Sequence, residues 1–253
     1  MTVKQTKYSA EHPEVWIPRD EPNAKKDTVV LAKIFNKYGK VKSVLDVGCG
    51  LGTHCYFLDK LGYTCEGVEP HSKMVERARK KYPGIKFNVG AMQDINYKNQ
   101  FDAVICVGSI IVFNRTNEEV FQTFKKFNRA LKKNGILIIE SSNPIRYIQG
   151  AKFKKSFQDV EKSLGVKVLY DEYIDERKQT YVSSRAYFDL KTGKKVGFFS
   201  KESRMFFPQE LKFFLEQAGF KVIEMFSADS FEKISLNYTK MDKWRMLVVA
   251  RRG

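Results

Sequence analysis

The sequence predicts an α/β fold: a parallel sheet covered by helices on both faces and interrupted by an antiparallel cap. Three observations lead to this fold class. Short apolar strands alternate with amphipathic helices between residues 43 and 139. Residues 103–107 are apolar at every position, as expected of a strand buried on both faces. Residues 168–199 instead contain three consecutive strand-like runs separated by turns, which breaks the alternation.

The elements of the first half follow from periodicity and from residues that start or stop helices. Val30, Ile34 and Tyr38 recur at helical spacing, which predicts a helix over residues 23–38 ended by Gly39. Thr116 and Glu119 have the spacing of a capping box for a later helix. The other expected elements are strand 43–47, helix 53–61, strand 63–68, a helix capped by Ser72, strands 85–89 and 103–107, the capped helix up to Asn134-Gly135, and strand 136–139.

The second half departs from this pattern and then returns to it. Residues 145–165 are polar and basic and are expected to be partly helical. Strand-like runs follow at 168–174, 179–190 and 194–199, and we interpret 145–199 as an inserted cap. Pro208 and Gly219 bracket a further helix, and residues 221–226 and 244–250 complete the sheet. The cap divides the main domain into residues 1–144 and 200–253, with 1–22 as an irregular N-terminal arm.

The chain has 253 residues, with 45 Lys and Arg against 29 Asp and Glu, a net charge of +16. Such a charge invites a nucleic-acid partner. The basic excess is nevertheless spread along the chain and not gathered into an arm, so solvated helix faces account for most of it. A nucleic-acid partner is therefore the disfavoured alternative.

Composition also bears on compartment and metals. No apolar run is long enough for a transmembrane helix, and the first ten residues lack the apolar stretch of a secretory signal. Cys49, Cys55, Cys65 and Cys106 show neither CxxC pairing nor metal-ligand spacing. We expect reduced thiols, a cytoplasmic location, no membrane association and no metal site.

The most informative segment is the glycine-rich stretch after the first predicted strand. Asp46, Gly48, Gly50 and Gly52 alternate with other residues, and a helix is predicted to begin at once at Thr53. Glycines permit a tight turn and a close approach of a ligand to the main chain, and the helix start supplies free N–H groups. Glu69 ends the second predicted strand, where a carboxylate can accept the ribose hydroxyls of an adenosine. The spacing is wrong for the G-x-G-x-x-G motif of NAD enzymes.

These residues resemble the motifs of class I S-adenosylmethionine-dependent methyltransferases. Asp46-x-Gly48-x-Gly50-x-Gly52 is similar to the first motif of that family, and Glu69 occupies the position of the family's ribose-binding acid. Phe101-Asp102-Ala103-Val104 resembles the fourth-strand motif. The resemblance implies a Rossmann-like seven-stranded sheet with helices on both faces and the last strand antiparallel. The cap is weakly similar to the insertion of small-molecule methyltransferases, including sugar-amine N-methyltransferases.

The same resemblance implies S-adenosyl-L-methionine as the cofactor and a set of residues that bind it. Gly90 to Asp94 look like the adenine-contacting loop, with Ala91 where related enzymes carry an acid, so Gln93 or Asp94 is expected to replace that contact. The cofactor-binding residues that we predict are Asp46, Gly48, Cys49, Gly50, Gly52, Glu69, Pro70, Ala91, Met92, Gln93 and Val107.

The acceptor is expected to bind where the fifth strand ends and the cap begins. Asn143 and Arg146 follow that strand, and Arg204 enters the late helix, so these three are predicted to bind substrate. For Arg204 an ion pair with Glu202 is the competing interpretation. The catalytic candidates are His12, Tyr147 and Arg204, since an amine acceptor needs a base. His54 is expected to pack against a helix and His71 to stand at a helix start.

We therefore predict a methyltransferase acting on a small-molecule N or O acceptor by in-line displacement. In such a transfer, alignment of nucleophile, methyl carbon and sulfur supplies much of the rate. An RNA or protein methyltransferase and a non-catalytic cofactor-binding module are the alternatives, and an NAD-linked oxidoreductase is disfavoured by the glycine spacing. The oligomeric state is left open between monomer and homodimer.

Overall fold

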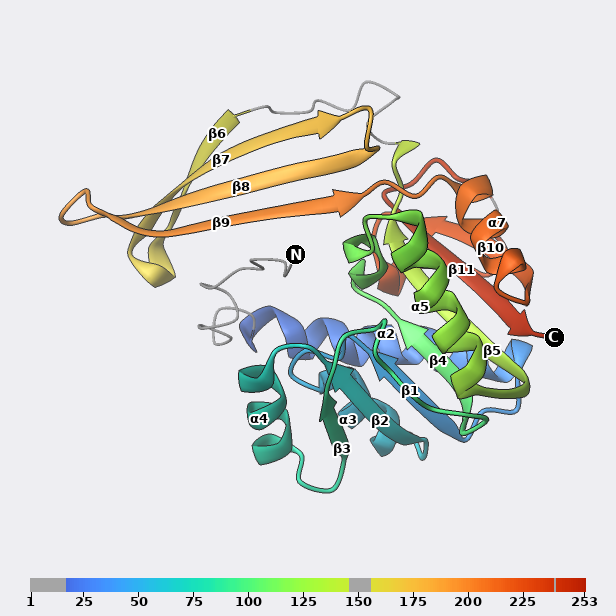
Figure 1. Ribbon diagram of the computed structural model, residues 1–253. Helices are drawn as coiled ribbons and strands as arrows, with labels where there is room; N and C mark the ends of the chain where they lie inside the picture. The colour runs from blue at the N-terminus through green and yellow to red at the C-terminus, as the bar shows by residue number, and fades with distance from the viewer. Residues whose placement is uncertain (1–16, 146–155, 239) are drawn as a thin grey trace.

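The computed structural model describes residues 17–145, 156–238 and 240–253 (Figure 1). Within these residues, seven strands form one mixed sheet in the order β10-β11-β5-β4-β1-β2-β3. β11 pairs antiparallel with both β10 and β5, and the remaining pairs are parallel, so the predicted antiparallel last strand is confirmed. The strands are β1 (Ser43–Val47), β2 (Thr64–Glu69), β3 (Lys86–Val89), β4 (Phe101–Cys106), β5 (Leu131–Ser142), β10 (Phe220–Ala228) and β11 (Arg245–Arg252).

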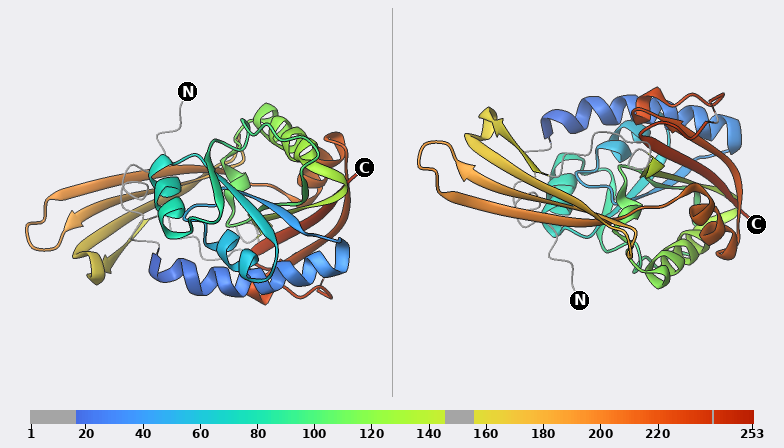
Figure 2. Two further views of the ribbon diagram at one scale, coloured as in Figure 1. Left: turned by 90° about the horizontal axis from the view of Figure 1, so that it is seen from below. Right: turned by 90° about the horizontal axis from the view of Figure 1, so that it is seen from above.

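Helices cover both faces of this sheet, as Figure 2 shows from below and above. The helices α2 (Ile17–Tyr38), α3 (Thr53–Lys60) and α4 (Ser72–Lys81) lie on one face. The helices α5 (Asn117–Ala130) and α7 (Pro208–Gln217) lie on the other. Alternate residues of the central strands serve the two cores: Val44 packs toward α2, whereas Leu45 packs toward α5. Burial on both faces explains why these strands are apolar throughout.

A second sheet of four antiparallel strands projects beyond the seven-stranded sheet (Figure 1). Its order is β6-β7-β8-β9, with β6 (Ser156–Glu161), β7 (Val166–Asp175), β8 (Thr180–Asp189) and β9 (Lys195–Arg204). The three predicted runs correspond to β7, β8 and β9, but β9 runs on to Arg204, so residues 200–204 belong to the second sheet and not to the main domain as predicted. Residues 145–165 were expected to be partly helical. Lys162–Leu164 do form a short helix, η3, whereas residues 156–161 form a strand, because Gln158 and its neighbours pair with β7. A short, half-exposed edge strand carries no regular apolar alternation from which it could be found.

Three helix boundaries differ from the prediction. α2 begins at Ile17 and not at residue 23, so residues 17–22 are not an irregular arm. Pro18 lies in the first turn, where main-chain N–H groups have no acceptor within the helix, so the missing N–H of proline is tolerated. His71, and not Ser72, is the N-cap of α4. α5 ends at Ala130, because Leu131 already pairs with Phe101, and residues 132–135 bulge out before Ala103 pairs with Ile136.

The predicted start of α5 and both predicted ends of α7 are confirmed. Thr116 Oγ1 accepts the N–H of Glu119 at 3.2 Å, and Glu119 accepts the N–H of Thr116 at 3.1 Å, which confirms the capping box. Pro208 occupies the first turn of α7, and Gly219 follows its C-cap with a φ of +85°. Among the described residues, no helix is long and apolar enough to cross a bilayer, and no cluster of His, Cys, Asp or Glu could hold a metal.

Candidate active site

The loop between β1 and α3 turns at the carboxyl end of the sheet. The N–H groups of Gly48 and Cys49 both donate to Val68 O, which ties the loop to β2. Gly48, Gly50 and Gly52 all have a positive φ, the left-handed region that favours glycine. A Cβ at Gly48 would lie 2.6 Å from Ile110 Cγ2, and one at Gly52 would overlap the ring of Phe87. A Cβ at Gly50 would meet nothing within 4 Å, so the main chain there borders open space.

The Gly52→Ala substitution is expected to lower the free energy of unfolding by about 2–3 kcal/mol, since it combines left-handed strain with overpacking. Phe87 is buried in the core and cannot move aside without cost. Gly62→Ala is the matched control, because Gly62 has a φ of +89° but open space around it. Urea denaturation of both variants measures the difference. Equal losses would contradict the role of the Phe87 contact.

Glu69 stands directly opposite this loop at the end of β2. Its Oε2 accepts the N–H of Gly50 and its Oε1 accepts the N–H of His71, both at 3.1 Å. The side chain is buried, and this burial raises the pKa of Glu69, while the bonds from His71 and Gly50 act in the other direction. Each carboxylate oxygen has two lone pairs, so one on each oxygen is left for a hydroxyl group of a ligand.

The loop after β3 is joined to the segment after β4 through Asn114. Gln93 Nε2 donates to Asn114 Oδ1 at 2.6 Å, and Asn114 Nδ2 lies 3.0 Å from Met92 Sδ. Asn114 is fully buried and also accepts from Thr123 Oγ1 at 2.8 Å. Asn114 thus holds two predicted site residues against the short helix η2 (Ile110–Phe113). The sequence analysis missed Asn114, whose one signal is a polar residue between an apolar run and a capping box.

A cavity of about 240 Å³ lies between the carboxyl ends of β4 and β5 and the near end of the four-stranded sheet. Gly108, Ser109 and Ser142 line it from the larger sheet. Tyr181, Lys201 and Ser203 line it from β8 and β9; Tyr181 pairs with Ser203 and Lys201 with Ser183, so these side chains share one face. The second sheet therefore forms one wall of a pocket at the carboxyl ends of β4 and β5.

A polar network at the edge of this cavity centres on Glu140, which is 1% exposed. Glu140 Oε2 accepts the N–H of Ser109 at 2.7 Å, and Glu140 Oε1 accepts from Arg245 Nη1 at 2.9 Å. Arg245 Nη1 also donates to Ser109 Oγ at 2.9 Å. Ser109 has a φ of +59°, so these bonds hold a residue in the left-handed region.

Comparisons with known proteins agree with this geometry. Residues 44–135 match the family model of a methyltransferase domain. A dTDP-3-amino-3,4,6-trideoxy-alpha-D-glucopyranose N,N-dimethyltransferase of Streptomyces venezuelae is 28% identical over 138 residues, 53% of this chain and 58% of that protein. A dTDP-3-amino-3,6-dideoxy-alpha-D-glucopyranose N,N-dimethyltransferase of Streptomyces fradiae is 28% identical over 54% of this chain and 55% of that protein. The chain thus spans little more than half the length of the curated relatives it matches.

Solved structures extend the likeness of fold to nearly the whole chain. An S-adenosylmethionine-dependent methyltransferase from Clostridium acetobutylicum superposes with a TM-score of 0.76 at 14% identity, covering 96% of this chain and 98% of that one. An amino pentose methyltransferase from Micromonospora echinaspora, solved with S-adenosylmethionine bound, has a TM-score of 0.71 at 20% identity over 98% and 99%.

Residues 44–135 form a methyltransferase domain, and the fold of the described residues is that of S-adenosylmethionine-dependent methyltransferases.

The resemblance of the motifs and the likeness of fold both point to S-adenosyl-L-methionine as the cofactor. The residues present fit it: Gly50 leaves room for a ligand against the main chain, and Glu69 keeps acceptor positions for two ribose hydroxyls. Of the other residues predicted to bind it, Asp46 and Cys49 are buried, and Asp46 Oδ2 lies 3.7 Å from Cys55 Sγ. Pro70 is exposed beside Glu69, Val107 is buried at the end of β4, and Ala91 is half-buried. Their contacts with the cofactor stay predictions.

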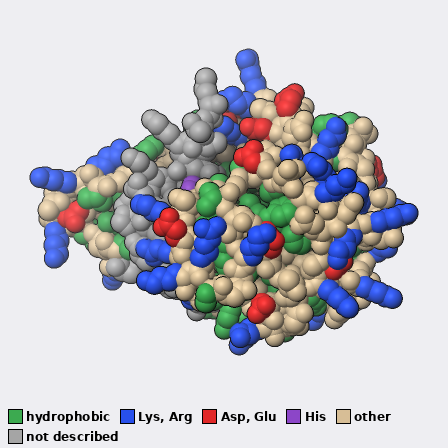
Figure 3. All heavy atoms as spheres, turned by 60° about the horizontal axis from the view of Figure 1, so that its bottom comes forward, with side chains coloured by type: hydrophobic (Ala, Val, Ile, Leu, Met, Phe, Trp, Pro, Cys, Tyr) green, Lys and Arg blue, Asp and Glu red, His purple; other side chains and the backbone are tan. Residues whose placement is uncertain are grey.

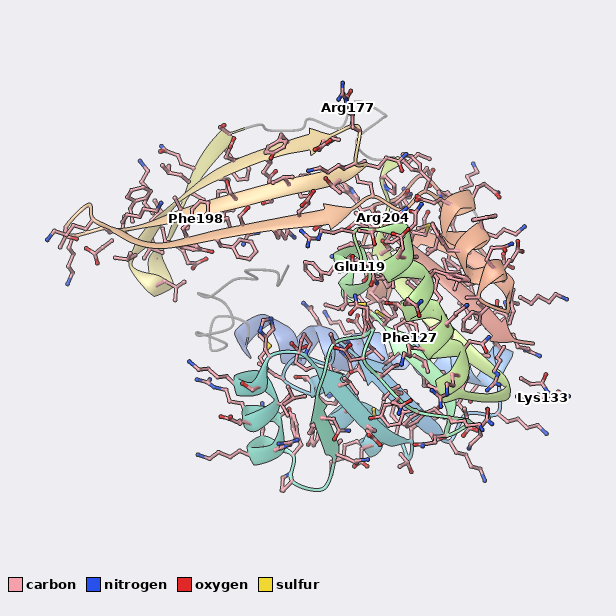
Figure 4. The ribbon with its side chains drawn as sticks, in the orientation of Figure 1. Glu119, Phe127, Lys133, Arg177, Phe198 and Arg204 are labelled. Carbon is pink, nitrogen blue, oxygen red and sulfur yellow. The ribbon has the colours of Figure 1, made fainter. Side chains whose placement is uncertain are left out.

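Arg204 lines the cavity but is also held by the fold (Figure 4). Its Nη2 donates to Glu210 Oε1 at 2.5 Å and to Asn117 Oδ1 at 2.7 Å, and its side chain is 7% exposed. The competing interpretation, an ion pair with Glu202, was wrong, because Glu202 pairs with Arg115 and Lys178 instead. Arg204 thus joins the last strand of the second sheet to α5 and α7 of the methyltransferase domain.

The Arg204→Met substitution is expected to lower the free energy of unfolding by about 2 kcal/mol, because it leaves the carboxylate of Glu210 without its cation. The loss is limited because Glu210 is partly exposed, so water solvates its carboxylate in part. Arg177 is the control, since it lies on the exposed turn between β7 and β8 (Figure 4). The Arg177→Ala variant should change stability by less than about 0.5 kcal/mol. Thermal and urea denaturation compare the two, and an unchanged Arg204→Met variant would contradict this assignment.

Some of the other candidate site residues lie in the part of the chain that the structure describes, and some lie outside it. Asn143 is fully buried and donates to Met241 O and Lys243 O, both at 2.9 Å, so both amide protons serve the fold. His54 Nε2 lies 3.4 Å from Asp27 Oδ2 of α2, which agrees with helix packing, and His71 stands at the start of α4. His12, Arg146 and Tyr147 lie outside the described residues.

Lys201 is the cavity residue that sequence analysis missed. Burial lowers the pKa of Lys201, the positive charge of Arg185 lowers it further, and Glu172 acts in the opposite direction. Arg245, from the network around Glu140, adds to the lowering. These groups come from β7, β8 and β11, far apart in the chain, so no local pattern marks Lys201.

Proposed function

We propose that this protein transfers a methyl group from S-adenosyl-L-methionine to the amino nitrogen of a sugar-type small molecule. The observation that carries the proposal is the cavity at the ends of β4 and β5, which has one wall formed by the second sheet. A concave pocket of this small volume suits a small acceptor better than a polymer. The named relatives that act on dTDP-amino sugars favour nitrogen over oxygen and a sugar over other small molecules.

The transfer needs an amine with a free lone pair. S-adenosyl-L-methionine supplies an activated methyl group on a sulfonium. The acceptor nitrogen attacks the methyl carbon as the carbon–sulfur bond breaks, and the sulfur keeps the electron pair. A protonated amine cannot attack, so a base must first take its proton.

Lys201 is our candidate for that base. It lines the cavity, and its pKa is lowered from that of an ordinary lysine, which makes the neutral amine, the form that accepts a proton, easier to reach. Ser109 and Ser142 line the opposite wall and offer hydroxyls to the acceptor. Glu140 accepts the main-chain N–H of Ser109 and so orients Ser109, which makes Glu140 a positioning residue.

The four cysteines are free and buried, which favours a reducing, cytoplasmic setting.

A label-transfer assay in cell extract tests the proposed function directly. Purified protein is incubated with methyl-labelled S-adenosyl-L-methionine and cell extract, then separated by size and by sensitivity to nuclease and protease. Label in the low-mass fraction supports the proposal, and dTDP-amino sugars are then tested singly. Label in nuclease- or protease-sensitive material would overturn it and assign the substrate to RNA or protein.

A further inference from the structure

A second cavity, of about 460 Å³, lies at the opposite edge of the sheet from the acceptor pocket. Its walls come from the end of α2, the start of β4, the bulge of β5 and the end of β11. Five basic side chains and one carboxylate line it: Lys37, Lys40, Lys132, Lys133, Arg251 and Asp102. Figure 3 shows Lys and Arg side chains along the right-hand end of the molecule, where α2 ends in Figure 1.

The single carboxylate does not neutralise this cavity. Asp102 accepts from Lys132 Nζ at 2.8 Å and from Ser43 Oγ at 2.9 Å, so it serves one lysine and the start of β1. No carboxylate of the described residues pairs with Lys37, Lys40 or Lys133. Like charges converging without counter-charges cost free energy, which an anion in their midst would remove.

Arg251 differs from the four lysines of this cavity. Its Nη2 donates to the main-chain O of Tyr38 at 2.6 Å, which holds the guanidinium at the end of α2. Arg251 is half-buried, whereas the four lysines are exposed. The cavity therefore combines one fixed cation with four cations that can turn toward a ligand.

We infer that this cavity is a binding site for a small polyphosphate anion. Lysine and arginine are the usual ligands of phosphate oxygens, and several of them around one hollow suit a chain of phosphates better than a single carboxylate. The cations come from three separate segments and line one hollow of the surface. A nucleic acid would instead follow an extended basic track. This site is independent of the proposed methyl transfer.

Titration calorimetry of the full chain with inorganic tripolyphosphate tests the site. One equivalent should bind, and binding should weaken with added salt. The double variant Lys37→Ala/Lys133→Ala should weaken binding by about tenfold or more, because it removes two of the unpaired cations. Lys73→Ala/Lys125→Ala is the matched control: it removes the same charge from exposed positions on α4 and α5 and should change binding less than about twofold.

Binding of S-adenosylhomocysteine, measured on both double variants, checks that they are folded. Equal weakening in both would overturn the site, because it would assign the affinity to net charge alone. Absence of saturable binding to the unmodified protein would overturn it as well. Tighter binding of a short single-stranded RNA than of tripolyphosphate, lost in the Lys37→Ala/Lys133→Ala variant, would overturn the assignment to a small anion and favour a nucleic acid.

Discussion

The Glu69→Ala variant is expected to bind S-adenosylhomocysteine a few hundred-fold more weakly than the wild type, a loss of about 3–4 kcal/mol. The estimate assumes two charge-assisted hydrogen bonds to the ribose, each worth about 1.5–3 kcal/mol. Glu69 is well placed for this role because Gly50 and His71 fix both oxygens from the main chain. Titration calorimetry with S-adenosylhomocysteine measures the affinity without turnover.

Two further variants sharpen this test. Glu76→Ala removes an exposed carboxylate of α4 and should leave the affinity unchanged. Glu69→Gln keeps an acceptor oxygen but loses the charge, so it should lie between the alanine variant and the wild type. Circular dichroism separates lost binding from lost folding. Unchanged affinity in a folded Glu69→Ala variant would remove the ribose assignment.

The Lys201→Ala variant is expected to lose about 1,000-fold in kcat/KM, within the range for removal of a general base. Its lowered pKa means that the amine of Lys201 loses its proton at a lower pH than an ordinary lysine. The activity of the wild type should therefore rise with pH as Lys201 deprotonates, and the variant should lack this limb of the profile. Binding of S-adenosylhomocysteine should stay at the wild-type level.

The Lys201→Arg variant distinguishes a base from an anion-binding cation. Arginine keeps the positive charge but does not deprotonate in a protein, so it should be as inactive as alanine. Rescue of activity by arginine would show that Lys201 binds an anionic part of the acceptor. Lys195→Ala, at an exposed position of the same strand, is the matched control and should retain full activity.

Local signals located much of the fold. The Thr116–Glu119 capping box and the Gly48–Gly50–Gly52 loop each depend on residues close together in the chain, so spacing alone identified them. Glu69 was placed by the same kind of reasoning, because the end of a parallel strand lies at the edge where ligands bind. The start of α2 was misplaced, since Pro18 and Pro22 are typical of a loop, yet Pro18 lies in the first turn of the helix and Pro22 inside it.

Some residues of the candidate site could likewise be found from the sequence, whereas others are brought together only by the fold. The predicted cofactor residues follow short motifs directly after β1, β2, β3 and β4, and each motif can be found from neighbouring residues of the chain. Gln93 and Asn114 meet across 21 residues, and Arg115 and Glu202 meet across 87, so these pairs exist only after the sheet has formed. The low pKa of Lys201 depends on burial and on Arg185 and Arg245, which no spacing along the chain specifies.

By itself, the sequence determined the α/β class, the glycine loop and the acid that faces it, because short-range periodicity and turn chemistry govern these features; the cofactor was indicated by the resemblance of these motifs to a known family. The tertiary structure alone decided that Arg204 pairs with Glu210, that Lys201 lines the cavity at the ends of β4 and β5 and that five cations share a second cavity. The physical reason is that burial and charge proximity arise from packing between distant segments, and packing is a property of the folded chain.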